Sequence, residues 1–94
     1  MRQAARTDAN HRAIVAALRK AGAQVRDLHR VGKDFPDLLV YSVRADRLWL
    51  MEVKSGRGKQ TAGQRAFAAR WPVHVVRTPE EALKIIHFSM FEEC

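Results

Sequence analysis

The chain has 94 residues, of which 47% are hydrophobic, so residues 1–94 suit one compact domain and leave no room for a second core. Seventeen Lys and Arg against ten Asp and Glu give a net charge of +7. This charge favours a polyanionic partner such as DNA or RNA, although a solvated surface that aids solubility explains it equally well. The single cysteine, Cys94, excludes an internal disulfide and a cysteine zinc site, and no apolar run is long enough for a membrane span, so we expect a soluble cytoplasmic protein.

The first part of the chain predicts a helix followed by a strand. The helix is expected over about residues 8–21, with Thr7 or Asp8 as its cap and Gly22 closing it. Residues 24–31 alternate loosely between apolar and polar side chains and predict a short strand.

Two apolar runs follow, at residues 38–43 and 48–51, and residues 44–47 between them suit a hairpin turn. Pro36 lacks an N–H donor, so it can open the first of these strands but not lie within it. Both runs carry apolar residues on both faces, which predicts two central strands covered on both sides.

The remaining segment predicts helix, strand and helix. Thr61 is suited to cap a helix that ends at Pro72, and residues 73–76 are expected to form a brief strand. Thr78 then precedes a proline and two glutamates, which begin a predicted helix over about residues 79–87. An apolar and acidic tail follows at 88–94. The whole order indicates a mixed α/β class, with helices flanking a central sheet.

Three charged residues are expected to meet at the end of this sheet. Alternate residues of a strand share a face, so Glu52 and Lys54 project together while Val53 points into the core. Antiparallel pairing brings the start of one strand beside the end of the next, which places Asp37 near Glu52. Two converging carboxylates repel one another unless a cation lies between them, and such oxygen ligands suit Mg²⁺ or Mn²⁺. Lys54 would then orient or deprotonate a water, or stabilise charge on a phosphate.

The same residues also have a plainer explanation. Glu52 and Lys54 would form a salt bridge, and Asp37 would cap a turn after the proline. Because the acid and the amine end an apolar strand, and a Pro-Asp pair opens its neighbour, we favour the metal-site interpretation.

These motifs, in this order, resemble the PD-(D/E)XK nuclease superfamily and, more closely, its VRR-Nuc branch. The resemblance extends over nearly the whole chain and implies a restriction-endonuclease-like αβββαβα core. The motifs that carry it are a helix ending in Ala-Gly, Gly32 ahead of Pro36-Asp37, Glu52-Val53-Lys54, Thr61-x-x-Gln64-x-x-Phe67 with Trp71, and Val-Val-Arg-Thr-Pro-Glu-Glu-Ala.

The resemblance implies Mg²⁺- or Mn²⁺-dependent hydrolysis of phosphodiester bonds in DNA, often branched or flapped. Asp37 and Glu52 would be metal ligands, the carbonyl of Val53 would add a third oxygen, and Lys54 would assist the attacking water. Stand-alone members of this size resemble homodimers that act on four-way junctions, here in the cytoplasm of a bacterial or phage-infected cell. No membrane or nucleotide cofactor is expected.

The first helix departs from the superfamily pattern, which commonly places a glutamate there pointing at the metal. Before Asp27 the only acid is Asp8, so Asp8 and Asn10 are the candidate substitutes, directly or through a metal-bound water. A DNA-binding module that keeps the fold but no longer cuts is therefore an alternative function. The apolar tail motif at 88–91 suggests another, a subunit of a larger complex.

Gln64 and three loop cations complete the candidate site. Gln64 lies on the apolar face of its helix, where it either bonds backbone near the helix start or, as the resemblance implies, reaches the active site or the DNA backbone. Lys33, Arg57 and Lys59 lie on the two loops beside the site, as phosphate contacts or as solvated cations.

The other aromatic and histidine side chains are interpreted as structural. The four aromatics that we assign to core packing rather than to base stacking are Trp49, Trp71, Phe67 and Tyr41. The four histidines are scattered without the spacing of metal ligands, so we expect packing or surface roles for them.

Overall fold

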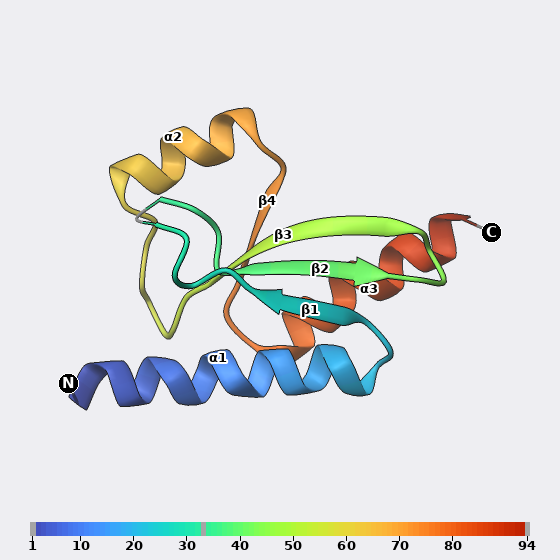
Figure 1. The fold of residues 1–94 in the computed structure, drawn as a ribbon, viewed down its shortest axis with the longest axis horizontal. Coiled ribbons are helices and arrows are strands. Elements are labelled where there is room, and N and C mark those ends of the chain that lie inside the picture. The colour runs from blue at the N-terminus through green and yellow to red at the C-terminus, as the bar shows by residue number, and fades with distance from the viewer. Residues whose placement is uncertain (1, 33, 94) are drawn as a thin grey trace.

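Helices lie around a four-stranded sheet in the computed structural model of the chain (Figure 1). It describes residues 2–32 and 34–93, with side chains for 9–32 and 34–87. The elements are α1 (Arg2–Lys20), β1 (Gln24–Asp27), β2 (Leu38–Ser42), β3 (Arg47–Val53), α2 (Ala62–Arg70), β4 (Val73–Val76) and α3 (Pro79–Glu93). This confirms the predicted α/β order. None of the helices in the described part of the chain is long and apolar enough to cross a membrane.

The sheet is mixed and has the order β1-β2-β3-β4. β1, β2 and β3 pair antiparallel, whereas β3 and β4 pair parallel. In this register Leu38 at the start of β2 lies between Asp27 of β1 and Met51 of β3, and Val53 lies opposite Val76. One end of the sheet therefore gathers the start of β2 and the ends of the other three strands (Figure 1).

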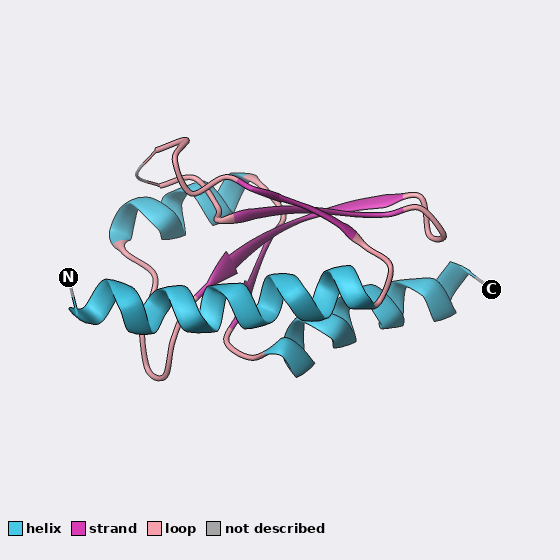
Figure 2. Cartoon of the chain, turned by 60° about the horizontal axis from the view of Figure 1, so that its bottom comes forward, coloured by secondary structure: helices cyan, strands magenta, loops and turns pink. Residues whose placement is uncertain are grey.

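The core lies between the sheet and the two long helices, α1 and α3, which run along the same face (Figure 2). Each helix contributes residues at a spacing of four, which align on one side of a helix. Burying a Leu or Ile side chain stabilises the fold by roughly 1.5–3 kcal/mol. Among the described side chains, the members of the hydrophobic core cluster that are completely buried are Ile14, Leu18, Leu38, Val40, Met51, Val76 and Ala82.

The opposite face of the sheet is largely uncovered, so the expectation of strands covered on both faces is wrong. Leu48 is exposed on β3, and Leu39 and Leu50 are only partly buried. α2 lies near one end of the strands (Figure 1), and none of its residues is buried. An apolar run shows that both faces avoid water, but it does not specify what covers them.

Both outer helices are longer than predicted. α1 begins at Arg2 and continues through Thr7 and Asp8, because Arg, Gln and Ala at positions 2–6 are all good helix formers. α3 continues to Glu93, so all but the last residue of the predicted tail is helical. Cys94 lies outside the described residues.

β1 is shorter than predicted and ends at Asp27. The Asp27 carboxylate accepts a hydrogen bond from the backbone N–H of His29 over 2.9 Å, which turns the chain away from the sheet. The backbone N–H of Leu28 then donates to the carbonyl of Asp37 over 2.7 Å. These bonds draw the end of β1 toward the start of β2.

Candidate active site

The end of the sheet brings the predicted acidic residues together. Asp37 directly precedes β2, and its Oδ2 accepts a hydrogen bond from the backbone N–H of Val53 over 2.8 Å. This bond links the start of β2 to the end of β3, where Glu52 and Lys54 flank Val53. The Val53 side chain is buried in the core, as alternation along the strand predicts.

Glu52 is the most unusual residue of the site, because a carboxylate that is only 1% exposed has few ways to offset its lost hydration. Its Oε2 is buried and has no hydrogen-bond partner among the described residues. The ammonium Nζ of Lys54 lies 3.7 Å from that oxygen, close enough for an ion pair but too far for a hydrogen bond. A cation beside Oε2 would satisfy it.

The donor set fits a small divalent cation that prefers oxygen ligands. Asp37 and Glu52 supply two carboxylates at the same sheet end. Among the described side chains, no group of three or more His, Cys, Asp or Glu is placed to hold a metal. A cation held by two carboxylates would complete its coordination with backbone oxygen and water, which is the usual arrangement for Mg²⁺.

Gln64 connects this site to the first turn of α2. Its Oε1 accepts hydrogen bonds from Nζ of Lys54 and from the backbone N–H of Thr61, each over 2.9 Å. The backbone N–H of Gln64 in turn donates to Oγ1 of Thr61 over 3.1 Å, which completes a capping box. Gln64 therefore bonds the backbone at the start of its helix, as one of the two expectations has it, and the same oxygen also accepts a hydrogen bond from Lys54.

Asn10 braces α1 against the backbone of the site. Its Nδ2 donates to the carbonyl of Lys54 over 3.1 Å, to the carbonyl of Arg77 over 3.3 Å and to Oγ of Ser55 over 3.4 Å. Carbonyl oxygens only accept, so the amide nitrogen must face the ends of β3 and β4. The side chain of Asp8, the other candidate on this helix, lies outside the described side chains.

The bracing role of Asn10 predicts an unusual order of stabilities for two variants. N10A removes the donor and should lower the free energy of unfolding by about 1–3 kcal/mol. N10D should lower it at least as much in EDTA, because a carboxylate would face two carbonyl oxygens. Urea unfolding with EDTA and with Mn²⁺ measures both effects. A more stable N10D that also binds Mn²⁺ more tightly would instead show that position 10 replaces the missing first-helix glutamate.

The loop between β3 and α2 carries the predicted phosphate contacts Arg57 and Lys59, both exposed. Arg77, at the end of β4, holds this loop by donating from Nη1 to the carbonyl of Gly58 over 2.6 Å and to that of Gly56 over 3.3 Å. Sequence reasoning missed Arg77, although its place directly after an apolar strand was a usable signal. Lys33, the third predicted contact, lies outside the described residues.

Two histidines assigned separate structural roles in fact gather around one aspartate. His11 Nε2 lies 2.9 Å from Oδ2 of Asp27, and the His29 ring lies edge-on to that of His11 with centroids 6.4 Å apart. Partial burial raises the pKa of Asp27, but hydrogen bonds from the His29 backbone and the His11 ring outweigh it, so the pKa is lowered overall. The cluster ties α1 to the end of β1, a contact that no spacing along the sequence reveals.

The arrangement of elements has a counterpart among solved structures. One of them, described as a "VRR_NUC domain", is similar to this chain with a TM-score of 0.71 and 26% sequence identity. The match covers 86% of this chain and 94% of that one. No family model matches the sequence, and no curated protein matches it significantly.

Proposed function

We propose that this chain, which belongs to the VRR-Nuc family, is a Mg²⁺- or Mn²⁺-dependent DNA endonuclease. The proposal starts from the nuclease-type function in DNA processing that this family has. The observation that carries the proposal is the carboxylate of Glu52. It is buried beside Asp37 and Lys54, and one of its oxygens has no hydrogen-bond partner among the described residues. A carboxylate in this state is suited to bind a cation.

Each residue of the site has a role in the proposed reaction. Asp37, Glu52 and the carbonyl of Val53 would hold the cation, which when bound activates the attacking water and stabilises charge on the phosphate. Lys54 carries three N–H donors and uses one on Gln64, so its other donors are available to orient that water or a phosphate oxygen. Gln64 fixes the lysine from the first turn of α2.

The loops beside the site would position the DNA. Arg57 and Lys59 are exposed, and the anchoring of their loop by Arg77 limits its motion. Lys33 belongs to the same proposed set from the loop before β2. Phosphate contacts carry no sequence information, which favours recognition of DNA shape, such as a four-way junction or a flap. We propose that the chain acts on such branched DNA as a homodimer.

The test is cleavage of a panel of labelled substrates: four-way junction, flap, plain duplex and RNA. With Mg²⁺ or Mn²⁺ we expect cuts near the branch point of the first two, and with EDTA we expect none. Failure to cut any DNA with either ion would exclude the endonuclease.

One observation favours a second candidate, a DNA-binding module that does not cut. Asn10 presents N–H donors to the site from α1, where the superfamily commonly has a glutamate. Calorimetry with Mn²⁺ separates the two candidates. Binding of branched DNA without any binding of metal would support the second.

A further inference from the structure

The uncovered surfaces of the chain differ in character. The open face of the sheet is apolar, and Trp71, which borders it, is 57% exposed, so the interpretation of Trp71 as a core residue is wrong. The edge of the sheet at β1 is instead basic. It extends over α1, β1 and the start of the loop after β1, and we call it the β1-edge surface. Its exposed cations are Arg12, Arg19, Lys20, Arg26 and Arg30.

Contacts between α1 and β1 fix the direction of this surface. Nη2 of Arg19 donates to the carbonyl of Val25 over 3.0 Å, whereas His11, earlier on α1, meets Asp27 at the end of β1. The helix and the strand therefore run side by side in opposite directions. Residues 11–20 of α1 give the β1-edge surface a length of about 14 Å, because a helix rises 1.5 Å per residue.

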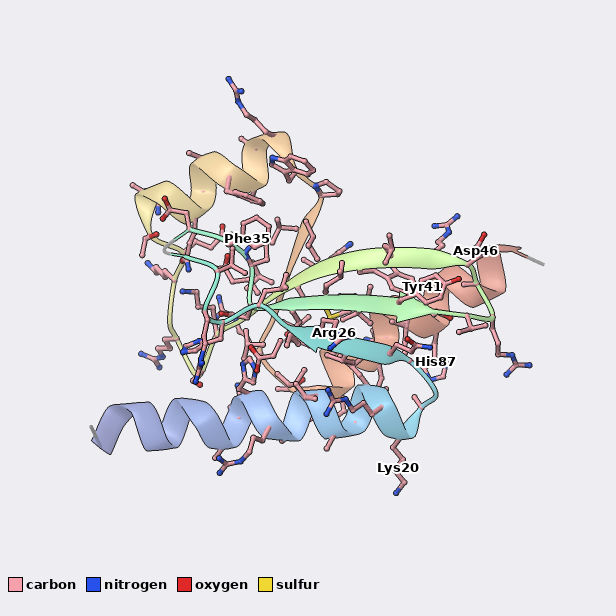
Figure 3. All side chains as sticks on the ribbon, in the orientation of Figure 1. Lys20, Arg26, Phe35, Tyr41, Asp46 and His87 are labelled. Carbon is pink, nitrogen blue, oxygen red and sulfur yellow. The ribbon has the colours of Figure 1, made fainter. Side chains whose placement is uncertain are left out.

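Most cations of this surface have no partner in the described part of the chain. Arg19 is engaged with the carbonyl of Val25, but the other four are exposed and form no hydrogen bond or ion pair with a described residue. Figure 3 shows two of them, Lys20 at the C-terminal end of α1 and Arg26 on the neighbouring β1. Their charge is available to a ligand, and it favours an anionic one.

Two hollows in this surface meet at Asp27. One, of about 390 Å³, lies between α1 and β1 and is lined by Arg12 among others, and the other, of about 330 Å³, is lined by Asp27, His29 and Arg30. Asp27 is the one acid in the described lining of either hollow. Its carboxylate is already engaged, at 2.9 Å by the His11 ring and at 2.9 Å by the backbone N–H of His29. The hollows therefore present cations to an approaching anion.

We propose that the β1-edge surface binds the phosphate backbone of a duplex arm that leaves the candidate active site. Its five cations against one acid attract a polyanion. Each strand of B-DNA carries one phosphate per about 3.4 Å, so about 14 Å of duplex passes about four phosphates of one strand. That number matches the four cations without a partner among the described residues. The inference rests on the proposed function for the identity of the polyanion as DNA.

The β1-edge surface begins beside the candidate site. The backbone N–H of Leu28, directly after Asp27, donates to the carbonyl of Asp37 over 2.7 Å, and Asp37 is a proposed metal ligand. Arg57 and Lys59 lie on the loop that follows β3, which pairs with β2 on the side opposite β1. A duplex that crosses this end of the sheet would therefore meet cations on both sides of the proposed metal. From there the β1-edge surface would guide one arm away from the branch point.

The test measures binding of a four-way junction by fluorescence anisotropy in EDTA over a range of salt concentrations. R12Q and R30Q each remove one exposed cation of the β1-edge surface. R44Q is the matched control, because Arg44 is exposed in the hairpin turn, at the opposite end of β2 from Asp37. R12Q and R30Q should each weaken binding about fivefold to tenfold at about 0.1 M salt, and each should lower the slope of log affinity against log salt by about 0.9. R44Q should change neither.

Two further readouts separate phosphate contact from a structural role of these arginines. R12K keeps the charge and should bind the junction within about twofold of the wild type, because Lys contacts a phosphate as a point charge. In cleavage with Mn²⁺, R12Q should act more slowly at low junction concentration but reach the wild-type rate at saturation. Circular dichroism should show that all variants remain folded.

Three results would overturn the inference. One is that R12Q and R30Q bind the junction like R44Q, and another is that R12K loses as much affinity as R12Q. The third is normal binding of the junction by R12Q and R30Q together with self-association in light scattering, which would assign the cations to protection of the exposed edge of β1.

Binding in EDTA depends on neither metal nor cleavage, so the inference and the proposed function can fail separately. A chain that never cuts DNA but shows these losses of affinity would refute the endonuclease and retain the β1-edge surface. A chain that cuts DNA but binds it equally well in every variant would refute the β1-edge surface alone.

Discussion

Replacing Glu52 by Gln should lower metal-dependent DNA cleavage on the order of a thousandfold or more. The substitution keeps the size of the side chain but removes the charge that attracts the cation. Losing a metal that stabilises the transition state by several kcal/mol has an effect of this size, because each 1.4 kcal/mol is about tenfold in rate. Glu52 is almost fully buried, so few water molecules can take over its role.

A second readout makes the Glu52 result independent of activity. Binding of Mn²⁺ to the folded state alone should raise the unfolding temperature of the wild type and leave that of E52Q nearly unchanged. E80Q is the matched control, because Glu80 is exposed in the first turn of α3 and was not predicted to take part in the site. Cleavage by E52Q at the wild-type rate, with the same response to Mn²⁺, would refute the assigned metal site.

Replacing Lys54 by Ala should lower cleavage about 10²–10⁴-fold while preserving metal binding. The ammonium holds the position between Glu52 and Gln64, at 3.7 Å and 2.9 Å, from which it can reach a water or phosphate. Its removal also leaves the buried carboxylate of Glu52 without its ion pair, which should destabilise the metal-free protein by on the order of 2 kcal/mol. The rise in unfolding temperature on adding Mn²⁺ should therefore be larger in K54A than in the wild type.

Reduced cleavage together with a larger response to Mn²⁺ would distinguish a specific role of Lys54 in the reaction from a general loss of structure in K54A. K59A removes an exposed loop lysine and should change neither the metal-free stability nor the response to Mn²⁺. K54R tests geometry, because a planar guanidinium cannot substitute for a compact ammonium against Gln64, and we expect it to remain impaired. If K54A loses the response to Mn²⁺, the lysine acts by shaping the metal site. If K54A cleaves normally, it has no part in the reaction.

Features carried by near neighbours in the chain could be read from the sequence alone. The alternation of side chains in a strand placed Glu52 and Lys54 on one face, and the hairpin between β2 and β3 brought Asp37 to the same end. The Thr61 cap could also be predicted from the sequence, because a capping box spans only four residues. Such patterns depend on the local geometry of one helix, one strand or one turn.

Contacts between elements depend on the tertiary structure, in which α1 and α3 pack on the sheet. Asn10 meets Lys54, which lies 44 positions further along the chain, and His11 meets Asp27 because α1 lies along β1. The open face was equally hidden, since the sequence shows that Leu48 is apolar but not that α2 is too short to cover it. Periodicity determines which side of an element avoids water, whereas the direction and length of the neighbouring element determine what that side meets. For this chain, the sequence determined which three residues form the proposed catalytic trio, and the tertiary structure decided how they are braced and which face of the sheet remains uncovered.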